Sequence, residues 1–293
     1  MKIARSGEEL LKICEEENIL LSEYAIRYEM ENRDISREEL FEKMKKNLRV
    51  MQDSAKDGMD KEIYSVSGLI GGDAYKLKKY YEKGESLTGD TMILAMAMAL
   101  SSSEVNAAMG KIVACPTAGS CGILPAVILT AGKKLNKTED ELIKALFASS
   151  ALGIIIGMNA TMAGAEGGCQ AECGSAAAMG AAAVVEMMGG TPKMSLDAAA
   201  IVFKNVLGLV CDPVAGLVEI PCAKRNSSGA VSALCTADLV MAGVESKIPF
   251  DDALSAMYKV GKSLPSELRE TALGGVAITK AGLELKKKVY GEE

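Results

Sequence analysis

Apolar residues recur every three or four positions through most of the chain, the spacing of a helix that buries one face. The pattern predicts helices at 7–17, 19–31, 36–57, 88–109, 122–133 and 139–157. It predicts further helices at 170–188, 195–208, 228–244, 250–262 and 266–273, with a short terminal one. Alternating β-branched runs are nearly missing, so no sheet is expected. We therefore expect an all-α, multi-helix globular fold.

Helix starts are marked by Ser/Thr-x-x-Glu sequences, in which the two side chains cap backbone N–H groups reciprocally. These capping boxes are Ser6 with Glu9, Ser36 with Glu39, and Thr138 with Glu141. The sequence "KLKKYYEK" (76–83) is typical of a solvated helix face. Three further segments, around 115–121, 167–173 and 211–222, are Gly/Pro-rich loops placed between predicted helices.

A change of composition near 60–85 separates a charge-rich start from an Ala-, Gly- and Met-rich remainder. We expect residues 1–65 to form an outer helical layer on a core at 90–280, within a single module covering 1–293. The segment 170–189 is built of small residues and is expected to be a central buried helix. Ala181, Ala182 and Ala183 would let neighbouring helices approach closely.

The amino-acid composition and net charge exclude several classes of protein. Hydrophobic residues make up 49% of the 293, with four Phe, eight Tyr and no Trp, so Leu, Ile, Val, Ala and Met must fill the core. The net charge of −6 argues against nucleic acid as a partner. Two uncharged stretches, 112–132 and 145–165, are interpreted as buried elements and not as membrane spans. The charged N-terminus is no signal peptide, and a cytoplasmic protein with reduced thiols is expected.

Histidine is absent. This excludes Ser-His, Cys-His and His-metal sites within the chain. A general base must then be Lys, Glu, Asp, Tyr or Cys, or it must lie on another polypeptide.

The eight cysteines fall into two groups. Cys14 and Cys235 lie in helical patterns and are expected to be small core residues. The others occupy Gly- and Pro-rich segments: Cys115 and Cys121, Cys169 and Cys173, Cys211 and Cys222. Six such cysteines without histidine favour a thiolate-bound metal, as structural zinc or an iron–sulfur cluster. Their spacing matches neither a zinc knuckle nor a ferredoxin, and buried cysteines lining tight turns remain the alternative.

Three motifs, "CPTAGSCGILPA", "EGGCQAECGSA" and "CDPVAGLVEIPCAKRN", resemble the α chain of the oxygen-sensitive, iron–sulfur-dependent bacterial L-serine dehydratases. The resemblance covers most of the chain and is strongest at 90–280. It implies a [4Fe–4S] cluster held by Cys169, Cys211 and Cys222, with no pyridoxal phosphate. It also implies a β chain as partner, since some members pair two chains and others fuse them. This chain would be the α half alone.

Three protein thiolates leave one iron of such a cluster open as a Lewis acid for the substrate's hydroxyl and carboxylate. The implied reaction converts L-serine to pyruvate and ammonia. Candidate substrate-binding residues are Thr117, Ser120, Asn159, Arg225, Asn226 and Ser227. Turn or N-cap chemistry is the alternative for Thr117 and Ser120, and an ordinary surface pair is the alternative for Lys224 and Arg225. Cys115, Cys121 and Cys173 are expected to line the site.

The general base is the least defined part of the site. Candidates within the chain are Glu166, Glu172 and Lys224. The resemblance instead implies a β-chain histidine, and hence an active site completed across a subunit interface. Two other functions stay open: a cysteine desulfidase-type lyase, which eliminates sulfide, and a non-catalytic helical module with structural zinc.

Overall fold

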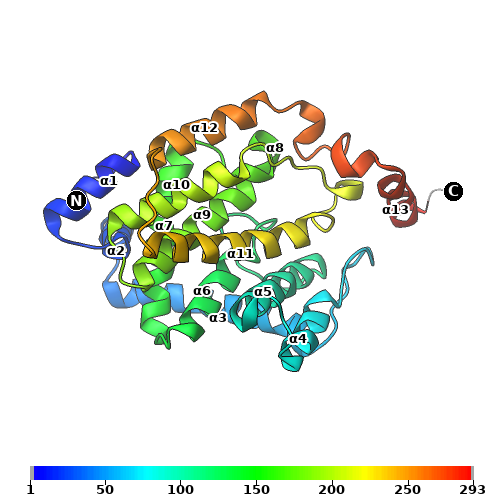
Figure 1. The fold of residues 1–293 in the computed structure, drawn as a ribbon, viewed down its shortest axis with the longest axis horizontal. Helices are drawn as coiled ribbons and strands as arrows, with labels where there is room; N and C mark the ends of the chain where they lie inside the picture. The colour runs from blue at the N-terminus through cyan, green and yellow to red at the C-terminus, as the bar shows by residue number, and fades with distance from the viewer. Residues whose placement is uncertain (1–2, 292–293) are drawn as a thin grey trace.

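The computed structural model describes residues 3–291, and within them it contains α-helices and short 3₁₀ turns but no strand (Figure 1). The first helices are α1 (Gly7–Glu17), α2 (Leu21–Arg33), α3 (Arg37–Asp60), α4 (Asp73–Lys83), α5 (Gly89–Ala107), α6 (Ile123–Lys134) and α7 (Glu139–Asn159). They are followed by α8 (Gly164–Gly167), α9 (Cys169–Met187), α10 (Pro192–Val206), α11 (Cys222–Met241), α12 (Phe250–Ser263) and α13 (Lys280–Tyr290). The all-α prediction is confirmed.

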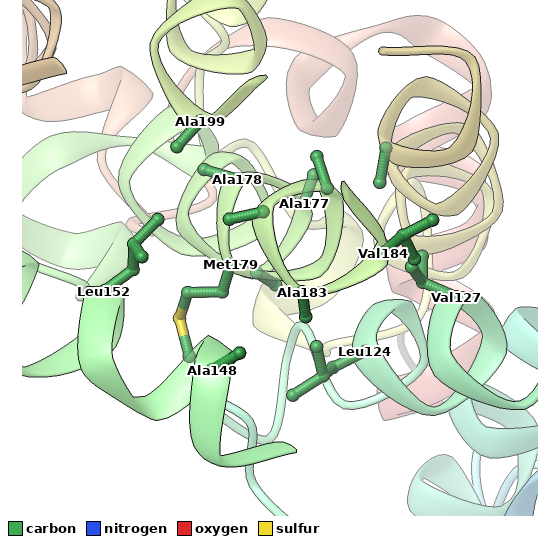
Figure 2. Close-up of a cluster of buried hydrophobic side chains, with 14 of the residues drawn as sticks. Leu124, Val127, Ala148, Leu152, Ala177, Ala178, Met179, Ala183, Val184 and Ala199 are labelled. Carbon is green, nitrogen blue, oxygen red and sulfur yellow. The ribbon is translucent and has the colours of Figure 1, made fainter. Parts of the chain in front are cut away.

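Helix α9 is the centre of the molecule, and it packs against α6, α7, α10 and α11. Figure 2 shows its small side chains meeting Leu124 and Val127 of α6 on one side and Leu152 of α7 on another. Ala181, Ala182 and Ala183 are completely buried. A Cβ added at Gly174 would lie 2.9 Å from Val206 Cγ2, and one at Gly180 would lie 3.2 Å from Val127 Cγ1. Small residues therefore set the close helix spacing, as predicted.

The N-terminal helices cover this core: α2 packs on α7, and α3 packs on α5. The division into an outer layer and a core within one module stays a prediction. Helix α13 lies at the far end of the long axis from the N-terminus (Figure 1) and contacts the 3₁₀ turns η1 (Val214–Gly216) and η3 (Gly275–Ile278). The Tyr290 hydroxyl donates to Ala215 O at 2.9 Å.

The capping boxes at Ser36 and Thr138 are complete. At Ser6 only half of the predicted box forms. The Ser6 hydroxyl accepts the Glu9 N–H, but the Glu9 carboxylate accepts from Arg5 N at 2.8 Å.

Two helix predictions need correction. Helix α11 begins at Cys222 and not at 228. The predicted helix 266–273 is wrong, because only a 3₁₀ turn, η2 (Ser266–Leu268), forms there. The backbone beyond it pairs with Cys211 instead: Cys211 N donates to Leu268 O at 2.9 Å, and Glu270 N donates to Cys211 O at 2.7 Å. The left-handed φ of 64° at Glu270 is incompatible with a continuing helix.

Cys14 is buried, as predicted, but the prediction for Cys235 is wrong. Cys235 is exposed because it shares the outward face of α11 with Ser228 and Leu239, while the opposite face packs on α9. Helix α7 is long and apolar enough to cross a membrane, yet more than half of its apolar 18-residue stretch is buried inside the protein. Its contacts with α2 and α9 fit the buried element expected from the sequence.

Candidate active site

Three cysteines stand where Gly- and Pro-containing loops meet helix starts. Cys169 is the first residue of α9, Cys222 is the first residue of α11, and Cys211 lies in the loop before η1. The turn into α9 needs Gly168, which has a φ of 75°. A Cβ there would also lie 2.7 Å from Leu264 Cδ1 and 2.8 Å from Leu209 O. The "EGGC" sequence thus provides the turn that places Cys169.

All three thiols are buried and reduced. Burial raises the pKa of Cys211 well above its ordinary value and that of Cys222 to about 12. After burial, the negative charge of Cys169 is the largest contribution to both increases, so the three thiols lie within electrostatic reach of one another.

Cys169 itself behaves differently. Its thiol shares a hydrogen bond with the Cys173 thiol, with the Sγ atoms 3.3 Å apart. This bond lowers the pKa of Cys169 and raises that of Cys173, and the positive charge of Arg225 also lowers the pKa of Cys169. Of the pair, Cys169 is the better thiolate.

These cysteines fit a cationic, thiolate-bound group. Buried thiolates are costly unless a cation compensates them, and a bound metal deprotonates its thiol ligands. Within residues 3–291, no group of three or more His, Cys, Asp or Glu side chains is close enough together to hold a single metal ion. Ligands of one ion must lie within about 4 Å of each other, because each metal–sulfur bond is about 2.3 Å long. The fit of a larger, multi-iron group rests on the burial and mutual proximity of the thiols.

An ion pair joins the loops that carry two of these cysteines. Arg225 Nη2 lies 2.8 Å from Asp212 Oδ1, and Arg225 Nη1 donates to Val210 O at 2.8 Å. The other Asp212 oxygen accepts from Val276 N at 2.7 Å. Asp212 and Arg225 therefore fix the Cys211 loop against the start of α11 and against η3.

A second group of polar side chains connects the loop before α6 to α9. The Thr117 hydroxyl donates to Glu172 Oε1 and lies 3.0 Å from Ser120 Oγ. Burial raises the pKa of Glu172, and the nearby Glu270 carboxylate raises it further. Glu172 follows Cys169 by three residues, so Thr117 and Ser120 are brought to the cysteine-bearing end of α9.

Asn226 holds this loop to α11. Its Oδ1 accepts from Gly122 N at 2.9 Å, and its Nδ2 donates to Gly119 O at 2.7 Å and Cys222 O at 3.0 Å. The side chain is buried with these contacts made. In the structure Asn226 is engaged with the backbone, and its expected role in substrate binding stays a prediction.

The other residues expected in the site from the sequence make contacts of their own. Ser227 is buried beside Asn226 at the start of α11. Asn159 ends α7 and donates to Arg5 O and Ile155 O, at 2.8 and 2.9 Å. Glu166 is exposed, with Lys262 Nζ 4.0 Å away. Lys224 is exposed and paired with Asp73 of α4. Their expected roles stay predictions.

Cys115 and Cys121 are buried beneath the Thr117 loop, where Cys115 Sγ donates to Val113 O at 3.3 Å. A cavity of about 680 Å³ lies elsewhere, near Lys134 and Met188 at the far ends of α6 and α9. It is lined by none of the predicted site residues.

Two neighbours of the cysteines were not expected from the sequence: Asp212 and Glu270. Asp212 could have been noticed, since an acidic residue directly follows Cys211 in "CDP". Nothing in the sequence pattern marks Glu270, which lies in a segment predicted as helix.

The fold and the site together define an all-α protein with a centre of buried cysteines. Residues 16–277 match the family model described as "Serine dehydratase alpha chain". The chain belongs to this family.

Three relatives show how similar the chain is to other members of this family. The chain is 49% identical to a "Probable L-serine dehydratase, alpha chain" of Bacillus subtilis (strain 168), over 98% of this chain and 95% of that one. It is 46% identical to the "L-serine dehydratase, alpha chain" of Peptoniphilus asaccharolyticus, over 98% of each. It is 36% identical to the "L-serine dehydratase TdcG" of Escherichia coli (strain K12), over 93% of this chain but 61% of that one.

Proposed function

We propose that this chain is the α chain of an L-serine dehydratase, a lyase that converts L-serine to pyruvate and ammonia. The observation that carries the proposal is the group of three buried cysteines at 169, 211 and 222, in a chain of this family. The two relatives named as alpha chains support a β chain as partner. The expected cytoplasmic location is part of the same proposal.

Cys169, Cys211 and Cys222 would hold a [4Fe–4S] cluster. When bound, the cluster would supply a Lewis acid for a substrate hydroxyl, which is otherwise a poor leaving group. The hydrogen bond between the Cys169 and Cys173 thiols lowers the pKa of Cys169 and so favours its thiolate. Arg225 adds positive charge beside Cys169 and Cys222.

The Thr117 loop would form one wall of the substrate site. Thr117 and Ser120 present hydroxyl groups beside Glu172, and Asn226 keeps their loop in place. Neutral donors and acceptors of this kind orient a small polar substrate without adding charge.

The decisive experiment is anaerobic purification with the β chain, followed by iron and sulfide analysis and a pyruvate assay with L-serine. Cys169→Ser, Cys211→Ser and Cys222→Ser should each abolish iron retention and pyruvate release. Cys14→Ser, a buried cysteine on α1, and Cys235→Ser, an exposed one on α11, are the matched controls and should retain both.

Full iron content in any of the three variants would show that the ligand set is wrong. Iron retention without pyruvate release from L-serine by the wild-type complex would contradict the proposed activity. A higher kcat/KM for L-cysteine than for L-serine would favour the desulfidase alternative.

A further inference from the structure

Gly164 in α8 lies where one thiol and two carboxyl groups from distant parts of the chain come together. A Cβ added to it would be 3.0 Å from Cys211 Sγ, 3.2 Å from Glu172 Oε2 and 3.3 Å from Glu270 Oε2. The two carboxylates thus face a common point beside Cys211. Glu172 comes from α9, and Glu270 comes from the segment that pairs with the Cys211 backbone.

The position of Glu172 is fixed from two further sides. Its Oε1 accepts from the Thr117 hydroxyl, and a Cβ added at Gly119 would lie 2.6 Å from the same oxygen. Glycines therefore stand on both sides of this carboxylate, and its second oxygen is directed toward Gly164 and Glu270. Glu270 is exposed, so the pair lies at an opening to solvent.

The two carboxyl groups lie close together, without a basic side chain of the described residues paired to them. Arg225 pairs with Asp212, and Lys262 lies near Glu166. Arg269, which precedes Glu270 in the chain, has a buried Nε without a hydrogen-bond partner in the described part of the chain and so does not pair with either carboxylate through it. Among residues 3–291, neither Glu172 nor Glu270 has an ion-pair partner. Two neighbouring carboxylates repel each other, so a cation placed between them would be strongly favoured.

We propose that Glu172 and Glu270 bind the α-ammonium group of the amino acid substrate and make the site specific for amino acids over hydroxy acids. The inference rests on the proposed function. An ammonium donates three hydrogen bonds, so one group can contact both carboxylates. Binding it beside Cys211 would bring the hydroxyl and carboxylate of the same small substrate toward the cysteine centre.

The test compares Glu172→Gln, Glu270→Gln and the double variant with the wild type, each as the anaerobically purified αβ complex. The matched control is Glu267→Gln, an exposed glutamate on the same segment as Glu270. Each single variant should raise the KM for L-serine about 10- to 100-fold, the usual effect of removing a charged hydrogen-bond partner. The kcat should fall by less than the KM rises, and iron content should be unchanged.

A second measurement separates charge recognition from a general loss of structure. 3-Hydroxypropionate has the carboxylate and hydroxyl of serine but no ammonium. In the wild type its inhibition constant should exceed the L-serine KM by at least about 10-fold. In the double variant this ratio should shrink toward one, because the KM rises while the inhibition constant does not.

An unchanged KM in both single variants would overturn the inference, as would equal weakening of L-serine and 3-hydroxypropionate. A loss confined to kcat would assign Glu172 to the chemical step and would also overturn it. If the wild-type complex releases no pyruvate from L-serine, the proposed function itself fails. If the wild-type complex is active but the variants have the wild-type KM, the ammonium site is contradicted and the proposed function is not.

Discussion

Arg225 and Asp212 form an ion pair, Nη2 to Oδ1 at 2.8 Å, that links the residue after Cys211 to the helix turn that begins with Cys222. Asp212 is almost completely buried, and the Arg225 side chain is 18% exposed. The pair also fixes η3, through the second Asp212 oxygen and Val276 N. Two cysteines that are separated in the sequence are thereby held in one arrangement.

Breaking this pair should be costly. Arg225→Met leaves the Asp212 carboxylate buried and uncompensated, and we expect a loss of about 3–5 kcal/mol in the free energy of unfolding. Anaerobic chemical denaturation measures it. Arg269→Met provides a comparison on the neighbouring segment. A loss below about 1 kcal/mol for Arg225→Met would mean that the pair does not hold the two loops together.

Asn226 gives a second prediction about the same region. Asn226→Ala would leave Gly122 N and Gly119 O without their partners, and each unsatisfied buried group costs about 1–3 kcal/mol. We expect a loss of about 2–6 kcal/mol in the free energy of unfolding, measured by denaturation of the protein without iron. Ser228→Ala, on the exposed side of the same helix, is the control. Unchanged stability in Asn226→Ala would favour a direct role in substrate binding.

The packing of α9 predicts that Ala182→Leu overfills the core. Ala182 is completely buried, and its carbonyl accepts from the Ser195 hydroxyl of α10 at 3.0 Å. The larger side chain should lower the free energy of unfolding by about 1–3 kcal/mol. Ala281→Leu, on the exposed side of α13, should change it by less than about 0.5 kcal/mol. Equal effects of the two substitutions would contradict the tight packing.

Glu104 of α5 should make stability depend on pH. It is buried, its Oε1 accepts from Asp73 N and Ala74 N at the start of α4, and its Oε2 has no partner among residues 3–291. Burial raises the pKa of Glu104 from 4.5 to about 7, and the Asp73 carboxylate contributes while Lys224 opposes the shift. The native state therefore binds this proton more tightly than the unfolded state does.

It follows that protonated Glu104 contributes about 3 kcal/mol to the free energy of unfolding. This contribution is fully present below about pH 4.5 and is lost as the pH rises through about 7. Denaturation at several pH values checks this. In Glu104→Gln the decrease between about pH 5 and about pH 8 should disappear. Glu82→Gln, an exposed residue of α4, should keep it. A pH slope that persists in Glu104→Gln would assign it to other groups.

The absence of histidine predicts slow turnover by this chain alone. A positioned general base contributes about 10²–10⁴ in rate. Adding a histidine-bearing β chain should therefore raise kcat for L-serine at least about 100-fold, with an apparent pKa in the histidine range in the pH–rate profile. Pyruvate release at the full rate by the purified chain alone would instead direct attention to Glu166, Glu172 and Lys224.

The class of the fold and the segments that carry the site cysteines are predictable from the sequence. The 3.6-residue periodicity, the capping boxes at Ser36 and Thr138, and the Ala-rich composition of 170–189 are local signals. Local signals specify where a helix forms and where it begins, because both depend on residues within a few turns. The Gly- and Pro-containing loops around Cys169, Cys211 and Cys222 were recognisable for the same reason.

Which loops and helix faces contact one another is not predictable from the local sequence and follows from the packing of the whole chain. Thr117 and Glu172 are 55 residues apart, and Glu270 reaches Cys211 through a backbone pairing that replaces a predicted helix. Cys235 is exposed, although its segment resembles a buried helix, because α11 turns that face away from α9. Such outcomes depend on packing between distant segments. The periodicity of a single segment indicates that one side of it is buried, but it does not indicate which other segment packs against that side.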